Sequence, residues 1–142
     1  MMRRVTMVLL PTLLAGLVLP LLVGGCKSGG KSAKAVADTY VGLMKNEKYD
    51  EAAKQWDYVT QARKDNEDWD SIQEGQRKLI ADKLAADKVP SLKLWSGYFP
   101  GSTKVTQVQE GSETATAQLE GGRVERLDLV KVGEQWKIAG ME

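Results

Sequence analysis

The chain has 142 residues, with 20 basic and 19 acidic side chains and no histidine. This length suits one ordinary domain. The near-neutral charge argues against sequence-independent nucleic-acid binding, which needs clustered lysine and arginine. The absence of histidine excludes Ser-His-Asp triads, His-Asp dyads and histidine-ligated zinc.

The first 25 residues have the layout of a secretory signal peptide. Arg3 and Arg4 precede an apolar run, Val5–Val23, that holds no charged residue. A basic start, an apolar middle and small residues before a cut are the expected parts. Removal of residues 1–25 leaves 18 basic and 19 acidic side chains, a formal charge of −1. We therefore expect an exported, near-neutral domain.

The leader ends in the sequence Leu22-Val23-Gly24-Gly25-Cys26. This ending resembles the bacterial lipobox, in which an aliphatic residue stands three before the cysteine and small residues precede the cut. The resemblance implies that a dedicated peptidase recognises Leu22, Val23, Gly24 and Gly25. It also implies that Cys26 carries a diacylglyceryl thioether and that the new amino terminus is acylated.

Two other interpretations of the leader stay open. The apolar run has 19 residues, close to the roughly 20 that span a bilayer, so it could be an uncleaved anchor. Pro11 and Pro20 interrupt the run and argue against this interpretation. Arg3-Arg4 is also a minimal twin-arginine signal, although the residues after it depart from the usual consensus.

Lipid on Cys26 makes the membrane the first expected partner. Each acyl chain contributes about 0.8 kcal/mol per buried methylene, so two or three chains anchor a protein stably. Lys27, rather than Asp, follows the cysteine, which in enterobacteria-like sorting indicates the outer membrane facing the periplasm. In a Gram-positive cell the same signal means the outer face of the plasma membrane. Residues 26–32 are then the lipidated cysteine and a flexible tether, and residues 33–142 the domain.

Helical spacing of apolar residues predicts the first part of the domain. The spacing runs from Ala33 to Met44, and Ser32 can cap its start. A second short helix is expected with Asp50 as N-cap and Trp56 on its inward face. A third helix is expected from residue 66 to 88, bounded by Pro90. Its expected inward stripe is Trp69, Ile72, Gln76, Leu79, Ile80 and Leu84.

Beyond Pro90 the pattern alternates and predicts strands. Leu92 and Leu94 begin this part, and further strands are expected near 105–108, at 114–119, at 123–132 and at 135–139, with turns between them. Leu127 and Leu129 share one parity while Val130 and Val132 share the other. This shift predicts a bulge, or a strand buried on both faces, near residue 130.

These elements predict an α+β fold: two to three N-terminal helices packed on a curved antiparallel β-meander, because neither layer can bury its apolar side alone. The segments 37–56 (ADTYVGLMKNEKYDEAAKQW) and 127–140 (LDLVKVGEQWKIAG) resemble the NTF2-like (cystatin-like) superfamily, in particular its small exported lipoproteins of uncharacterised function. The resemblance implies that a pocket between helices and sheet is common, and that some members are pocket enzymes using a carboxylate.

The sequence predicts no catalytic residue, metal site or cofactor. The nearest acid–base set is Arg126 with Asp128, two apart and so on one strand face. A surface ion pair explains these two residues more simply. Asp57 could be a pocket acid, but a residue at a helix end facing water is the simpler interpretation.

Aromatic residues form the candidate pocket or partner patch. Trp95, Tyr98 and Phe99 lie within five residues, near a Pro-Gly loop, and could form a ligand rim or a docking surface. Trp56 and Trp136 are further candidates for a pocket lining. Core closure is the simpler interpretation, because a domain whose only cysteine is lipidated has no disulfide and needs a large core.

Three functions follow in order of preference. The first is a non-catalytic envelope lipoprotein that docks a protein partner or supports an assembly, and it predicts an apolar surface patch. The second is a binding module for a small apolar ligand, which predicts a closed pocket lined by tryptophan. The third is a carboxylate-based pocket enzyme, which predicts a buried acid with a raised pKa.

Overall fold

The computed structural model describes residues 30–142. The leader, its recognition residues Leu22 to Gly25 and Cys26 lie outside this range. Within it, no helix has the length and apolar character needed to cross a membrane. The elements in chain order are α1 (Ala33–Lys45), α2 (Tyr49–Ala53), α3 (Val59–Asp65), η1 (Trp69–Ser71), α4 (Glu74–Leu94), η2 (Ser96–Tyr98), β1 (Lys104–Glu110), β2 (Thr114–Glu120), β3 (Arg126–Val132) and β4 (Gln135–Met141).

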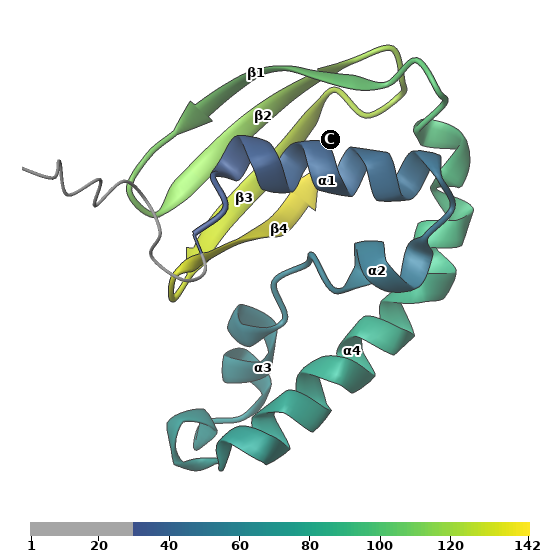
Figure 1. The fold of residues 1–142 in the computed structure, drawn as a ribbon. Helices are drawn as coiled ribbons and strands as arrows, with labels where there is room; N and C mark the ends of the chain where they lie inside the picture. The colour runs from purple at the N-terminus through teal and green to yellow at the C-terminus, as the bar shows by residue number, and fades with distance from the viewer. Residues whose placement is uncertain (1–29) are drawn as a thin grey trace, which may run out of the picture.

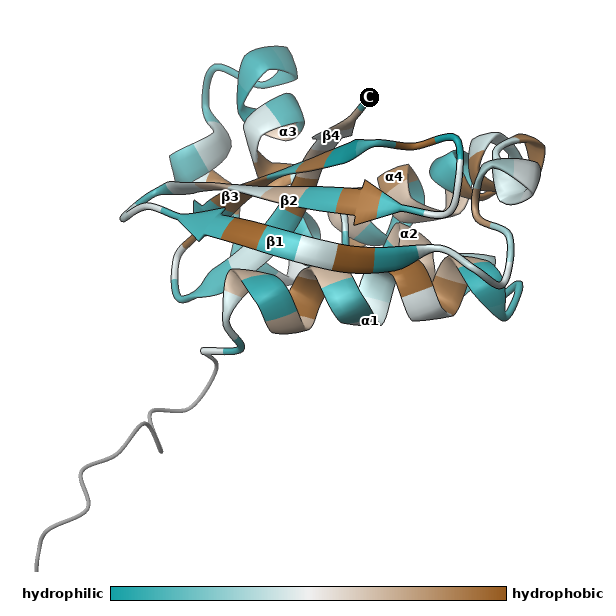
Figure 2. Ribbon diagram, turned by 90° about the horizontal axis from the view of Figure 1, so that it is seen from above, coloured by the Kyte–Doolittle hydropathy of each residue, from teal (hydrophilic) through white to brown (hydrophobic). Residues whose placement is uncertain are grey.

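The four strands form one antiparallel meander in the order β1-β2-β3-β4. The first helix, α1, lies across one face of this sheet (Figure 1). Figure 2 shows the same layering from above, with hydrophobic residues on α1 and on the strands. Alternate strand residues are buried on the helix side: Ala115, Ala117, Leu119, Leu127, Leu129, Trp136 and Ile138. The α+β fold with helices on a meander is confirmed.

The first helix forms as its apolar spacing predicts. Ser32 is the N-cap, and its hydroxyl accepts a hydrogen bond from the Ala35 N–H at 3.1 Å. The buried positions recur at helical spacing on the sheet side: Ala33, Val36, Ala37, Tyr40, Val41 and Met44. The expected cap and inward face of this helix are therefore both confirmed.

Large side chains fill the space between α1 and the sheet. Burial of each large aliphatic or aromatic side chain contributes about 1.5–3 kcal/mol relative to exposure, so this layer accounts for much of the stability of a domain without a disulfide. The largest fully buried apolar side chains are Tyr40, Met44, Leu92, Leu127, Leu129 and Ile138.

The expectation of one helix from Asn66 to residue 88 is wrong in its first part, because residues 66–73 hold a break and η1, and only residues 74–88 are helical, as part of α4. The break begins at Asn66, which adopts an extended conformation and whose side-chain amide donates to the Ala62 carbonyl at 2.9 Å. Gln73 is also extended, and α4 begins only after it. Of the expected stripe, Trp69 is buried but Leu79 is 70% exposed.

The expectation that Pro90 ends this helix, and that Leu92 and Leu94 lie in a strand, is also wrong. Helix α4 continues through Pro90 to Leu94. A proline removes one N–H from the helix interior, here the bond to the Ala86 carbonyl. Both Pro90 and Ala86 are exposed, so water can satisfy that carbonyl.

The start of the second helix and the pairing of the last two strands were also expected from the sequence. The second helix begins at Tyr49, with Lys48 rather than Asp50 at its N-cap. The pairing of β3 with β4 shifts register between Asp128 and Leu129, leaving Ala139 as the extra residue. The irregularity expected near residue 130 is therefore present in the pairing, but its extra residue lies on β4, and Val130 and Val132 are half-buried on the outer face of β3.

Gly121 provides a test of how the turn between β2 and β3 is packed. It has a φ of +83°, and a Cβ there would lie 2.3 Å from the Ser102 carbonyl oxygen. Gly133 has a φ of +62° but open space around it. A left-handed conformation costs a residue with a Cβ roughly 1–2 kcal/mol. We predict that Gly133→Ala loses about that much unfolding free energy, and that Gly121→Ala loses roughly 1–3 kcal/mol more.

Urea unfolding of the two glycine variants beside the parent chain measures these losses. Equal losses in the two variants would contradict the close approach of Ser102 to the turn.

Candidate functional site

A short connection after α2 joins the helical half of the domain to the edge of the sheet. The Ile138 N–H donates to the Gln55 carbonyl at 2.7 Å, and the Asp57 N–H donates to the Ile138 carbonyl at 2.8 Å. Trp56, between them, forms a parallel bridge with Ile138. This connection fixes the Trp56 side chain where helices and sheet meet.

Trp56 belongs to an aromatic cluster, defined as Tyr40, Trp56, Trp95 and Phe99. Tyr40 meets Trp56 and Phe99 edge to face, at centroid distances of 6.1 and 5.9 Å. Trp95 lies 6.3 Å from Trp56. The Trp56 indole N–H donates to the Tyr40 hydroxyl at 3.3 Å. Burial raises the pKa of Tyr40 to about 12, so this phenol stays neutral near pH 7.

Of the five aromatic residues predicted as a pocket or partner patch, three meet in this cluster: Trp56, Trp95 and Phe99. Phe99 is only 3% exposed. Tyr98 lies outside it, beside the Arg123 guanidinium. Trp136 is separate as well, on β4 beside Lys131.

Lys88 on α4 caps the cluster. Its ammonium lies 3.8 Å from the centroid of the Trp56 ring and 5.2 Å from that of Trp95, within range of a cation–π interaction with both. Burial lowers the pKa of Lys88. Lys88 was not predicted from the sequence as a site residue, although its spacing from Ala85 and Leu92 puts it on the inward face of the helix.

Figure 1 shows α3 and α4 projecting from the end of the sheet as an arm. A groove lies between residues of this arm and the strand residues Val132 and Lys137. It consists of a hollow of about 270 Å³ beside Trp56 and a second of about 920 Å³ beside Trp69. Val59 and Ala81 line both hollows, and the two hollows together are called the arm groove. Val132 at the end of β3 closes its inner side.

The arm groove has more basic than acidic side chains. Lys78 pairs with Asp82 at 2.5 Å, and Arg63 pairs with Asp70 at 3.3 Å. The lining includes the basic residues Lys54, Arg63, Arg77, Lys78 and Lys137 and the acidic residues Asp57, Glu74 and Asp82.

Three of the basic side chains in the groove, Lys54, Arg77 and Lys137, form no ion pair within 4 Å among residues 30–142. The Lys137 ammonium donates to the Lys54 carbonyl at 3.1 Å. Burial lowers the pKa of Lys137, and the nearby Asp57 carboxylate opposes this shift. The groove therefore offers free positive charge next to apolar surface.

The acids proposed for catalysis have structural partners. One oxygen of Asp57 accepts the backbone N–H groups of Val59 and Thr60 at 3.0 and 3.1 Å, which fixes the start of α3. Asp128 lies 3.1 Å from Arg126, on the strand face away from α1. Arg126 also pairs with Glu142 at 2.6 Å.

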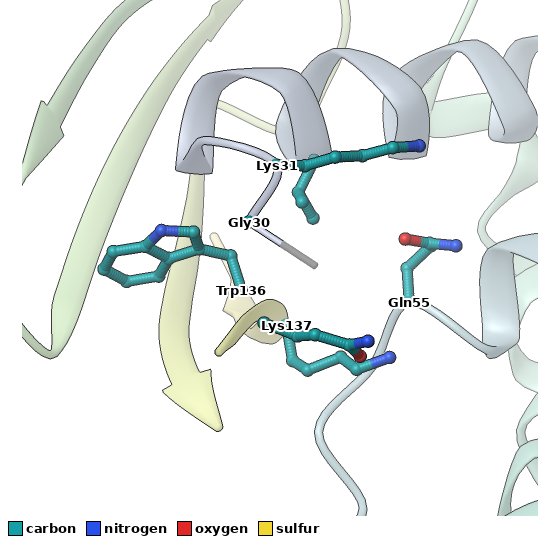
Figure 3. A pocket seen from close by; sticks show the side chains of 7 residues that line it. Gly30, Lys31, Gln55, Trp136 and Lys137 are labelled. Atoms are coloured by element: carbon teal, nitrogen blue, oxygen red, sulfur yellow. The ribbon is translucent and has the colours of Figure 1, made fainter. Parts of the chain in front are cut away.

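A further hollow of about 550 Å³ lies where the tether enters the domain. Figure 3 shows Lys31, Gln55 and Lys137 around it, with the Trp136 indole pointing to the opposite side from Gln55. Gly30, the first residue of the described range, forms part of the lining. This hollow shares Lys137 and Gln135 with the lining of the arm groove.

Among residues 30–142, no three carboxylate or cysteine side chains gather as a metal-binding group would. In comparisons with known proteins, no family model matches the chain, and no curated protein or solved structure is significantly similar to it.

The burial of Lys88 gives a pH-dependent prediction. Its pKa is below the ordinary 10.5 in the folded chain, so between these two values the unfolded chain binds more protons. The free energy of unfolding contributed by Lys88 therefore rises with pH through that window. We predict that the parent chain gains stability relative to Lys88→Met as the pH rises from neutral to 10.5, the ordinary pKa of lysine.

Urea unfolding at both pH values measures this gain. Lys64→Met, which removes an exposed lysine of α3, is the matched control and should keep the pH dependence of the parent. The same pH dependence in the Lys88 and Lys64 variants would show that the Lys88 ammonium is not desolvated.

Proposed function

We propose that the chain is a lipid-anchored, non-catalytic protein of the cell envelope, whose domain docks a protein partner in the arm groove. The single observation that carries the docking is the groove itself. Apolar residues, among them Val59, Ala81 and Val132, lie in it beside basic side chains without ion-pair partners. Such a surface suits an elongated macromolecular segment.

The anchoring at Cys26 is supported by the lipobox-like leader. Gly30, Lys31 and Ser32 are exposed and lead directly into α1. The seven residues from Cys26 to the start of α1 span at most about 25 Å when fully extended. The domain would therefore act close to the membrane, on the outer membrane facing the periplasm if the cell is Gram-negative.

The resemblance to the NTF2-like superfamily remains part of the proposal. One helix across the face of a four-stranded antiparallel meander supports it. The layer between them is filled by side chains such as Tyr40, Leu127 and Ile138. A filled layer favours docking on the surface over a ligand held between helix and sheet.

The structural roles of Asp57 and Asp128 make catalysis the least favoured of the three functions. Asp57 is held by two backbone N–H groups at the start of α3. Asp128 is tied to Arg126 on a partly exposed strand face. A general base needs a free, tuned carboxylate near a bound substrate, and both of these carboxylates serve the fold.

The charges of the groove indicate the chemistry of the partner. Lys54, Arg77 and Lys137 can pair with carboxylates, and Trp69 and Val59 can cover apolar side chains. The partner segment should therefore carry acidic residues interleaved with apolar ones. Electrostatic attraction of this kind mainly speeds association and weakens as salt is added.

Site-specific photocrosslinking in intact cells tests the docking. Ala81→p-benzoylphenylalanine places the reactive group in the groove, and Gln118→p-benzoylphenylalanine places it on the exposed outer face of β2. We predict a discrete adduct from position 81 only. Its partner peptide should be acidic and apolar, and purified partner should bind the parent chain at least about tenfold more tightly than Arg77→Glu.

Lys64→Glu, a reversal outside the groove on exposed α3 surface, should leave that affinity unchanged. An adduct from position 118 alone, or equal affinities of the Arg77 and Lys64 variants, would overturn docking in the groove.

One observation favours the second candidate, a binding module for a small apolar ligand. Trp56 lines the hollow of about 270 Å³, and the half-buried side chain of Lys137 lies beside it. Octanoate, which combines a carboxylate with a short apolar chain, is a suitable probe. Saturable quenching of tryptophan fluorescence by octanoate that is lost in Lys137→Met would favour a small carboxylate ligand with an apolar chain over a protein partner.

The anchor has its own test. Because the lipid attaches to the thiol, Cys26→Ser should be neither lipidated nor cut by the lipoprotein peptidase. We predict that this variant keeps the mass of the full precursor and loses incorporation of labelled fatty acid. Normal maturation and membrane fractionation of Cys26→Ser would contradict the lipoprotein assignment. Cys26→Ala should match Cys26→Ser.

A further inference from the structure

The outer face of α4 carries a stripe of four apolar residues and one lysine, called the α4 stripe and defined as Leu79, Lys83, Ala86, Pro90 and Leu94. All five residues are exposed, and the two leucines are 70% and 81% exposed. At 100° per residue the five fall within about 80° of the helix surface. They lie opposite the inward residues of the same helix, Ala85, Lys88 and Leu92. Nothing in residues 30–142 covers this stripe.

The stripe is close to symmetric about its middle. Leu79 lies seven residues before Ala86, and Leu94 lies seven residues after Asp87. A second α4 packed antiparallel, with a twofold axis between positions 86 and 87, therefore sets Leu79 of each copy against Leu94 of the other. A twofold contact needs such a self-complementary patch.

The residues between the leucines suit the same contact. Ala86 is at the centre, where a small side chain lets two helices approach to about 8 Å. Lys83 and Asp87 lie on the same flank of the stripe, and neither forms an ion pair within 4 Å among the described residues. In the antiparallel arrangement Lys83 of each copy comes within reach of Asp87 of the second copy.

We propose that the α4 stripe is a self-association surface, at which two copies of this chain pack antiparallel. The segment from Leu79 to Leu94 is about 22 Å long, so the interface is smaller than a standard stable one. Copies tethered to one membrane share a high effective concentration, which lets a weak contact form. The high effective concentration rests on the proposed lipid anchor, whereas the antiparallel packing of the two helices does not depend on it.

Disulfide trapping in the full lipidated chain tests the arrangement. Because the thiol of Cys26 carries lipid, Ala86→Cys supplies the only reactive thiol. In the proposed dimer the two introduced cysteines lie next to each other across the twofold axis. We predict that mild oxidation of membranes links most of this variant into dimers. Gln118→Cys, exposed on the far strand face, should link at least about tenfold less. Leu79→Glu combined with Ala86→Cys should abolish the link.

A charge exchange gives the second test. Lys83→Asp in the Ala86→Cys chain sets like charges across the interface and should lower dimer yield about threefold. Adding Asp87→Lys restores complementarity and should restore the yield. These exposed positions should leave thermal unfolding of the domain unchanged.

Three results would each overturn the self-association. The first is linkage at position 86 no greater than at position 118. The second is linkage that survives Leu79→Glu. The third is failure of Asp87→Lys to rescue Lys83→Asp. Failure of Cys26→Ser to lose its lipid would instead bear on the anchor, so the two proposals can fail separately.

Discussion

The attachment of residues 55–57 to β4 is the constraint on which the rest of the structure depends. Two backbone hydrogen bonds to Ile138 hold this connection at the sheet edge. They fix Trp56 against Tyr40 of α1 and Trp95, and Trp56 in turn receives Lys88 of α4. The direction of the arm, and hence the position of the groove, follows from that one junction.

The sequence predicted the parts of the fold in which local pattern and burial agree. The first helix has its apolar residues at helical spacing and a serine cap, and every expected inward residue is buried. The strands β2 to β4 alternate as the sequence does, and Val130 and Val132, which depart from the parity of Leu127 and Leu129, are half-buried on the outer face of β3. Here the burial of one face leaves a single workable register.

The predictions from sequence were wrong where tertiary packing or solvent exposure overrode a local preference. Pro90 normally ends a helix, but its lost hydrogen bond lies on the solvent side of α4, where water replaces it. Leu79 fits an inward stripe by spacing, yet α4 buries the opposite face around Lys88 and Leu92. The arm groove joins segments far apart in the chain, such as Val59, Ala81 and Val132, and no single-segment pattern marks it.

The filled core and the groove support the proposal that the domain acts through its surface, within a tether's length of the membrane. Thiol accessibility in the cell tests this most directly, with Ala81→Cys in the groove and Gln118→Cys on the outer sheet face. We predict that a maleimide labels residue 81 readily in the purified chain but poorly in intact envelopes, while residue 118 is labelled in both. Equal labelling of residue 81 in both preparations would show that the groove has no partner.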